Sequence, residues 1–95
     1  MLIRNFRHKG VKQLYERGRA KLPANCIVKL SNMLSFIDAM ESEEELRNLQ
    51  KWKAHQLTGD RSGVWSLHVS ANWRLTFWVD PEGPEACDLD FEDYH

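Results

Sequence analysis

Apolar residues in the first half of the chain recur with a helical period. The first apolar stripe covers residues 11–15 and ends near Gly18. The second follows Pro23, a residue suited to a helix's first turn, and runs to about Met40. The apolar positions are Val11, Leu14 and Tyr15 in the first stripe and Ile27, Leu30, Met33, Leu34 and Ile37 in the second.

A short third helix is predicted between residues 42 and 49. The run Ser42-Glu43-Glu44-Glu45 has the form of a capping box. In such a box the side chain of Ser42 caps the helix start, and the side chain of Glu45 reaches back to it.

After about Lys51 the period of the apolar residues changes to two. Apolar and polar positions alternate over 65–69, 73–79 and 88–92, as in strands with one face on a core. Turn-forming residues at 57–63 and 80–84 separate these segments. Short connections favour antiparallel pairing, with the helices packed on one face of the sheet. The pattern predicts an α+β fold in a single domain.

Composition narrows the compartment and the class of protein. Hydrophobic residues make up 42% of the 95, an ordinary share for a globular domain. No apolar run approaches the ~20 residues that span a bilayer, and residues 1–7 lack the apolar stretch of a secretion signal. Cys26 and Cys87 form no CxxC pattern and are expected to be buried free thiols. We therefore expect a cytoplasmic protein and no membrane partner.

The formal net charge of −1 hides a strong asymmetry along the chain. Residues 1–53 contain 11 Lys and Arg against 6 Asp and Glu, whereas residues 54–95 contain 2 against 8. The basic half is suited to nucleic acid or to an acidic protein partner. Composition alone favours the simpler interpretation, a solvated charged face.

Candidate chemistry is limited to acid–base groups. The four histidines and two cysteines have no metal-ligand spacing, and the chain has no phosphate loop and no Ser-His-Asp order. We therefore predict no metal and no cofactor, and no nucleophile from the protein. The run Glu92-Asp93-Tyr94-His95 brings several titratable side chains together. It is either a frayed polar end or an extension of the last strand.

Two residues on the polar face of the segment 73–79 have competing interpretations. Arg74 is either a solvated residue of the sheet or a fork that binds phosphate. Trp78 shares its face and either stacks on a nucleobase or covers a helix or a partner protein.

Together these residues resemble the HigB-type toxins of the RelE/ParE superfamily over nearly the whole chain. The resemblance rests on four segments, 4–16, 55–60, 63–67 and 71–77, together with the terminal Asp93-Tyr94-His95. It implies one toxin domain over residues 1–95, with an opening strand and helices packed on a twisted antiparallel sheet, the RelE-like microbial ribonuclease fold. It also implies metal-independent cleavage of mRNA on the ribosome. The implied partner is a helix-turn-helix antitoxin of the HigA type, and operator DNA is bound only through that antitoxin.

The resemblance also assigns roles to residues. The positions of the family's active site are taken here by His55, Arg74, Asp93, Tyr94 and His95. His55 and His95 are expected to share the acid and base roles, with Asp93 as an alternative base. Expected RNA contacts are Lys53, Trp78 and the N-terminal basic residues Arg4, Arg7, Lys9 and Lys12. Thr58 departs from the family, because relatives often have lysine there.

There are two alternatives to an RNA-cleaving toxin. One is a ParE-like toxin that binds gyrase without cleaving RNA. The other is a decayed toxin that only binds its antitoxin, which the loss of a lysine at Thr58 would fit. The two imidazoles of His55 and His95 argue for the nuclease, because a protein-binding inhibitor does not need them.

Overall fold

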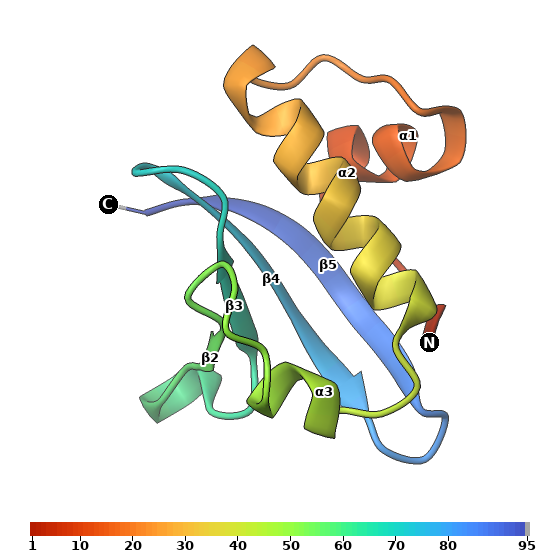
Figure 1. Cartoon of the computed structure of the whole chain (residues 1–95), viewed down its shortest axis with the longest axis vertical. Coiled ribbons are helices and arrows are strands. Elements are labelled where there is room, and N and C mark those ends of the chain that lie inside the picture. Colours follow the sequence, from red (N-terminus) through yellow and green to blue (C-terminus); the bar gives the residue numbers. More distant parts are fainter. Residues whose placement is uncertain (95) are drawn as a thin grey trace.

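The computed structural model describes residues 1–94, which form helices at the start of the chain and strands in its second half (Figure 1). The helices are α1 (Lys9–Arg17), α2 (Ala24–Ala39) and α3 (Glu44–Arg47), followed by a 3₁₀ turn, η1 (Gly59–Arg61). The strands are β1 (Leu2–Ile3), β2 (His55–Gln56), β3 (Trp65–His68), β4 (Trp73–Asp80) and β5 (Glu85–Asp93).

The termini of α1 follow from local chemistry. His8 is the N-cap, and its Nδ1 accepts a hydrogen bond from the backbone N–H of Val11 at 3.2 Å. Gly18 ends the helix with φ 76°, and its N–H donates to the carbonyl of Leu14. A left-handed residue at this position favours glycine because it has no Cβ.

The predicted capping box before α3 is present in part. The carboxylate of Glu45 reaches back and accepts from the backbone N–H groups of Glu41 and Ser42, at 2.6 and 3.2 Å. The start of α3 has no side-chain cap, so the predicted role of the Ser42 hydroxyl is wrong. Ser42 instead contributes its carbonyl, which accepts from the N–H of Glu45.

The strands form one sheet in the order β1-β5-β4-β3-β2. The predicted antiparallel pairing holds from β2 to β5. At the other edge β1 pairs with β5 in parallel, which makes the sheet as a whole mixed. β1 and β2 have two residues each, too few to show alternation in the sequence.

The core lies between one face of the sheet and the helices. Figure 1 shows α1 and α2 together on this side of the sheet. The alternation predicted for the strands is observed, since β4 buries Leu75, Phe77 and Val79 and β5 buries Leu89 and Phe91. The helices contribute Val11, Leu14, Cys26, Leu30, Met33, Leu34 and Ile37. Cys26 and Cys87 are buried free thiols, as predicted.

The other face of the sheet carries polar residues aligned by the strand register. One row joins His55, Ser66, Thr76 and Asp90, and a second joins His68, Arg74 and Glu92. Directly paired residues of antiparallel strands leave the sheet on the same side, so each row forms a line of neighbouring side chains. No helix within residues 1–94 is long and apolar enough to cross a membrane.

Candidate active site

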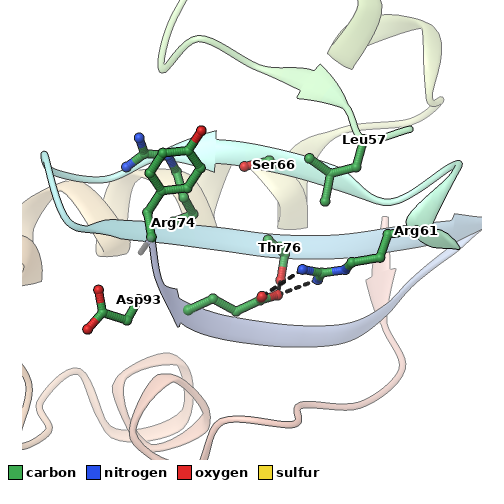
Figure 2. Close-up of a pocket in the computed structure, with 8 residues that line it drawn as sticks. Leu57, Arg61, Ser66, Arg74, Thr76 and Asp93 are labelled. Carbon is green, nitrogen blue, oxygen red and sulfur yellow. Dashed lines mark hydrogen bonds and ion pairs between the residues drawn. The ribbon is translucent and has the colours of Figure 1, made fainter. Parts of the chain in front are cut away.

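A cavity of about 550 Å³ opens on the polar face of the sheet (Figure 2). Its walls come from the loop before β3 and from the strands β3, β4 and β5. The residues that line it are Leu57, Arg61, Ser66, Arg74, Thr76, Glu92, Asp93 and Tyr94. Three of the predicted site residues are therefore brought together here.

Arg74 is fixed in the cavity by backbone and by an aromatic ring. Its Nη1 donates to the carbonyls of Ser70 at 2.6 Å and Trp73 at 3.0 Å. Its Cζ lies 4.1 Å from the centre of the Tyr94 ring, a cation–π contact. Because the carbonyl contacts use Nη1 alone, the guanidinium is held in place while its other N–H groups are not engaged by these carbonyls.

Tyr94 is placed by the backbone that precedes it. Its N–H donates to the carbonyl of Asn72, in the β3–β4 turn, at 2.6 Å. The end of the chain up to Tyr94 is therefore tied to the sheet rather than frayed. Although 65% of Tyr94 is exposed, its ring lies against Arg74. This contact leaves the phenol at the mouth of the cavity.

Asp93 lies at the margin of the cavity. It pairs in register with Trp73, whose ring stacks on Phe91 at 4.4 Å on the core side. The side chain of Asp93 thus leaves β5 on the side opposite to Glu92, and Figure 2 shows its carboxylate turned away from Thr76. His95, the remaining predicted residue of the tail, lies outside the described residues.

His55 lies at the rim of the cavity rather than among its lining residues. Its partner in the ladder, Ser66, does line the cavity, so both side chains emerge on this face. The Nδ1 of His55 lies 2.8 Å from the carbonyl of Lys53. Because a carbonyl only accepts, Nδ1 carries the proton and Nε2 is the nitrogen left to exchange one.

The segment before β2 has unusual backbone angles. Trp52 and Lys53 have φ of 59° and 46°, in the left-handed region that non-glycine residues rarely adopt. The carbonyls of both residues are used, since Trp52 accepts from the N–H of His68 and Lys53 from the His55 ring. Lys53 is exposed, and its charge helps to lower the pKa of His68 on the polar face.

His68 lies beside the cavity, although it is not among the site residues predicted from the sequence. It pairs directly with Arg74 in the ladder, so it lies beside the cavity on the same face. Burial lowers the pKa of His68 below its usual value, and the charges of Arg74, Lys53 and Lys29 lower it further. His68 is therefore a neutral imidazole at physiological pH. Its position on the polar face of the strand 65–69 was visible in the sequence, but its pairing with Arg74 was not.

An ion pair that the sequence analysis also missed crosses the cavity. Nη1 and Nη2 of Arg61 donate to the two carboxylate oxygens of Glu92, at 2.8 and 2.5 Å. The hydroxyl of Thr76 donates to the same carboxylate. The pKa of Glu92 lies below its usual value, mainly because the carboxylate is hydrogen-bonded to the Arg61 guanidinium. Burial raises this pKa, and the hydrogen bond from Thr76 lowers it.

The predicted RNA contacts of the N-terminal half are dispersed. Arg4 is committed to Glu85 at 2.6 Å and Asp80 at 2.5 Å, and its guanidinium lies 5.9 Å from the Trp78 ring. Lys9 and Lys12 are exposed on α1, in the helix layer across the sheet from the cavity. The structure therefore does not bring these basic residues to the cavity.

Arg7 and Trp78 line a second, smaller cavity of about 230 Å³ on the polar face. The indole N–H of Trp78 donates to Asp88 at 2.8 Å, so its polar group is satisfied inside the protein. The two cavities share Arg61, Thr76 and Glu92. Among the described residues, no group of three or more His, Cys, Asp or Glu side chains is arranged to hold a metal ion.

Comparison with known proteins places this chain in a family. The model of the HigB-like toxins, described as the RelE-like toxin of type II toxin–antitoxin system HigB, matches residues 4–95. The chain belongs to the HigB-like toxin family. It is 42% identical to endoribonuclease HigB of Proteus vulgaris over 95 residues, which cover 99% of this chain and 100% of that protein. As a HigB-like toxin, the chain is a component of a type II toxin–antitoxin system.

Solved structures confirm the RelE-like fold that the resemblance implied. The YoeB/ParE toxin from Agrobacterium tumefaciens superposes with a TM-score of 0.61 at 19% identity, covering 97% of this chain and 99% of that one. The YoeB–YefM complex from Staphylococcus aureus gives 0.58 at 18%, covering 100% and 98%. The RelBE2 toxin–antitoxin complex from Mycobacterium tuberculosis gives 0.53 at 21%, covering 97% and 95%. At these identities the likeness shows the fold alone.

Proposed function

We propose that this HigB-like toxin is an endoribonuclease that cleaves mRNA on the ribosome, without a metal, and so inhibits translation. The observation that carries the proposal is Arg74, whose guanidinium is held at the cavity under Tyr94 with imidazoles on the same face. The relative from Proteus vulgaris, matched over its full length, is named an endoribonuclease, which supports the same activity here.

The chemistry that such a site supplies is general acid–base catalysis. The 2′-OH of the substrate is the nucleophile and attacks the adjacent phosphorus, while the bond to the 5′-oxygen breaks. A base takes the 2′-OH proton, an acid protonates the departing oxygen, and fixed positive charge stabilises the phosphorane. Arg74 supplies the positive charge, because a guanidinium held in one orientation suits the oxygens of a phosphate.

The acid and base roles fall to histidines. His55 offers Nε2 on the cavity side of the sheet because its Nδ1–H is held by Lys53. We assign the acid role to His95, because an imidazole can donate as well as accept a proton near neutral pH. Asp93 is the alternative base, and Tyr94 stacks on a base or orients the scissile phosphate. His68, neutral beside Arg74, is a further candidate for the base.

The partners follow from this function. The substrate is mRNA in the ribosome, with Lys53 facing its phosphates. The basic N-terminal segment, which lies away from the cavity, contacts phosphates of ribosomal RNA. The antitoxin is a helix-turn-helix protein of the HigA type, and operator DNA is reached through it alone. We place the toxin in the cytoplasm, where translation occurs. Two structural neighbours were solved as complexes with an antitoxin, in keeping with such a partner.

Purified toxin in a translating bacterial extract tests the proposal. The protein is prepared free of antitoxin, with an untagged C-terminus, and is stripped of bound metal with EDTA, which is then removed by dialysis. It is incubated with a labelled mRNA, with and without ribosomes, in the Mg²⁺ that ribosomes require. Primer extension maps the cut ends. We expect ribosome-dependent cuts from the wild type and none from His55→Ala/His95→Ala. Glu44→Gln, an exposed change on α3 outside the cavity, serves as the matched control and retains cleavage.

The outcomes separate the proposal from its rivals. Absence of cleavage by a folded wild-type protein overturns the nuclease and points to a toxin that only binds protein. Cleavage that is lost after the toxin is stripped of metal, and that returns when a transition metal is added back, overturns the metal-independent mechanism. Cuts that do not need ribosomes overturn the ribosome dependence, and cleavage by the double variant removes the histidines from the mechanism.

A further inference from the structure

The Arg61–Glu92 pair lies inside the cavity that holds Arg74. Both residues line the cavity, and Figure 2 shows the side chain of Arg61 reaching toward Thr76, with the hydrogen bonds of the pair drawn as dashed lines. We propose that Glu92 masks Arg61, occupying the guanidinium fork that an RNA phosphate enters when substrate binds. This inference rests on the proposed function and assigns to its site a second phosphate-binding arginine and a carboxylate that competes with RNA.

The contacts between Arg61 and Glu92 have the geometry in which an arginine binds a phosphate. The two N–H groups of Arg61 meet two oxygens of one planar anion, at 2.8 and 2.5 Å. A phosphodiester presents two non-bridging oxygens with a similar separation, so one fork serves both anions. The fork cannot hold both at once. A phosphate that takes the same fork of Arg61 must therefore displace the carboxylate of Glu92.

The two partners differ in how firmly they are held. Glu92 is part of β5, pairs in register with Arg74 and accepts a further hydrogen bond from Thr76. Arg61 ends the short turn η1, and 49% of its side chain is exposed against 27% for Glu92. The long arginine side chain is thus the part free to swing toward RNA, while the carboxylate stays with the strand.

The charge inside the cavity is balanced as the protein stands. Its lining includes two arginines, Arg61 and Arg74, and the carboxylate of Glu92; Asp93 adds a second negative charge at the margin, with its carboxylate turned away. A polyanion gains little attraction from a lining of this kind, and each carboxylate that faces it repels it. Replacing the charge of Glu92 leaves a net positive lining with both arginines available to phosphate.

The pair also separates two hollows on the same face. Arg61, Thr76 and Glu92 line both the main cavity and the second one, which reaches Arg7 and Trp78. Opening the pair joins the hollows into one groove that runs from Tyr94 to Trp78. The second hollow is also lined by Asp60, Asp88 and Asp90, so the part of this groove suited to an RNA phosphate is the main cavity, where Arg61 and Arg74 lie.

The test measures binding separately from cleavage. The probe is a short single-stranded RNA with methylated 2′-oxygens, which lack the proposed nucleophile, and fluorescence anisotropy is recorded over a range of salt. We expect Glu92→Gln to bind at least about fivefold more tightly than the wild type, since one charge-assisted contact is gained. The slope of log affinity against log salt should steepen by about 1, as for one added phosphate contact.

Two comparisons isolate Arg61. The variant Glu92→Gln/Arg61→Gln has the net charge of the wild type, and we expect it to bind like the wild type. Glu44→Gln adds the same charge on α3, where Glu44 pairs with Arg47, and should leave binding unchanged. Thermal unfolding checks that each variant is folded. Glu92→Thr, whose β-branched side chain suits a strand, repeats the test if the glutamine variant is not folded.

The masking proposal and the proposed function fail in different ways. Equal or weaker RNA binding by folded Glu92→Gln overturns masking, as does an equal gain in Glu44→Gln or no measurable binding by either. Wild-type cleavage on ribosomes in the same preparations would then leave the nuclease standing. Tighter binding by Glu92→Gln, with no cleavage by any variant, overturns the nuclease but supports the proposal that Glu92 masks Arg61.

Discussion

Arg74 shows how one side chain is prepared for phosphate by its surroundings. The carbonyls of Ser70 and Trp73 hold Nη1, and the Tyr94 ring covers the plane of the guanidinium. A lysine ammonium at this position has neither the planar fork nor the face that stacks on a phenol. Lysine at position 74 would keep the positive charge but would lose the fixed orientation of the guanidinium.

Arg74→Lys is therefore expected to lower ribosome-dependent cleavage by on the order of 10²–10³, the effect of removing one group that stabilises a transition state. The measurement is the initial rate of mRNA cleavage, with circular dichroism to verify folding. Arg47→Lys on α3, an arginine outside the cavity, is the matched control and should cleave like the wild type. Wild-type rates from Arg74→Lys would exclude Arg74 from phosphate binding.

The free energy of unfolding is expected to depend on pH through His68. Its pKa is lowered from 6.5 in the folded protein, first by burial and then by Arg74, Lys53 and Lys29. As the pH falls below 6.5, the unfolded chain takes up a proton at His68 that the folded protein does not, so the free energy of unfolding decreases. The contribution of neutral His68 is complete above that pH and is lost as the pH falls through the lower folded value.

We expect His68→Gln to lose less stability on acidification than the wild type. The measurement is the urea midpoint of both proteins between about pH 7.5 and pH 5.5, a range that brackets an ordinary imidazole. Since all other titrating groups are shared, the difference between the two proteins isolates His68. Identical pH dependence in both would show that His68 is not perturbed by folding.

At the scale of elements, the antiparallel ladder from β2 to β5 builds the site. Its register aligns His68, Arg74 and Glu92 in one row. A bulge between Thr76 and Trp78 interrupts the pairing of β4 with β5, and such a bulge bends a strand and changes the aim of its side chains. The hydrogen bond from Tyr94 to Asn72 then extends β5 far enough to lay the tyrosine on Arg74.

The end of α1 depends on one left-handed residue. Gly18 has φ 76°, and a Cβ added there meets nothing within 4 Å. Gly18→Ala should therefore cost about 1 kcal/mol of unfolding free energy, all of it from the backbone conformation. Gly18→Asn should cost less, because asparagine tolerates this region better. Urea denaturation measures both, and an alanine variant as stable as the wild type would contradict the assignment.

At the scale of the whole molecule, the helices occupy one face of the sheet and leave the other to the site. A chain of 95 residues buries only roughly 60–65% of its unfolded surface, so each buried apolar side chain carries a large share of the stability. Leu89 is fully buried, and its carbonyl accepts from the N–H groups of Arg7 and His8. The core therefore meets the N-terminal segment at this residue.

Leu89→Ala is expected to lower the unfolding free energy by about 2–5 kcal/mol, the cost of a cavity in a packed core. Val28→Ala, also a truncation of an aliphatic residue, is the control because Val28 is 73% exposed on α2. Its effect should stay within about 0.5 kcal/mol. Similar losses from both variants, measured by urea denaturation, would show that burial does not set the cost at Leu89.

Local periodicity was sufficient to predict several elements of the fold. The positions of α1, α2 and β3–β5, and the face on which most of their apolar residues lie, follow from spacings of three, four and two residues; Tyr15 of the first stripe is 39% exposed. Arg74 and Tyr94 were placed in the site by resemblance to the HigB-type toxins, and the cavity contains both. The role of His95 stays a prediction.

Which polar residues become neighbours depends on the folded structure and could not be predicted from the sequence. Alternation tells on which face His68 lies, but the partner across the ladder depends on loop lengths and on the bulge in β4. The pair of Arg61 and Glu92 joins residues 31 apart, in a loop and a strand whose approach no local pattern encodes. β1 is likewise stabilised by its pairing with β5, since two residues carry no period of their own. Contacts of this kind exist only once the chain has folded, so the cavity's charge balance was not readable from the sequence.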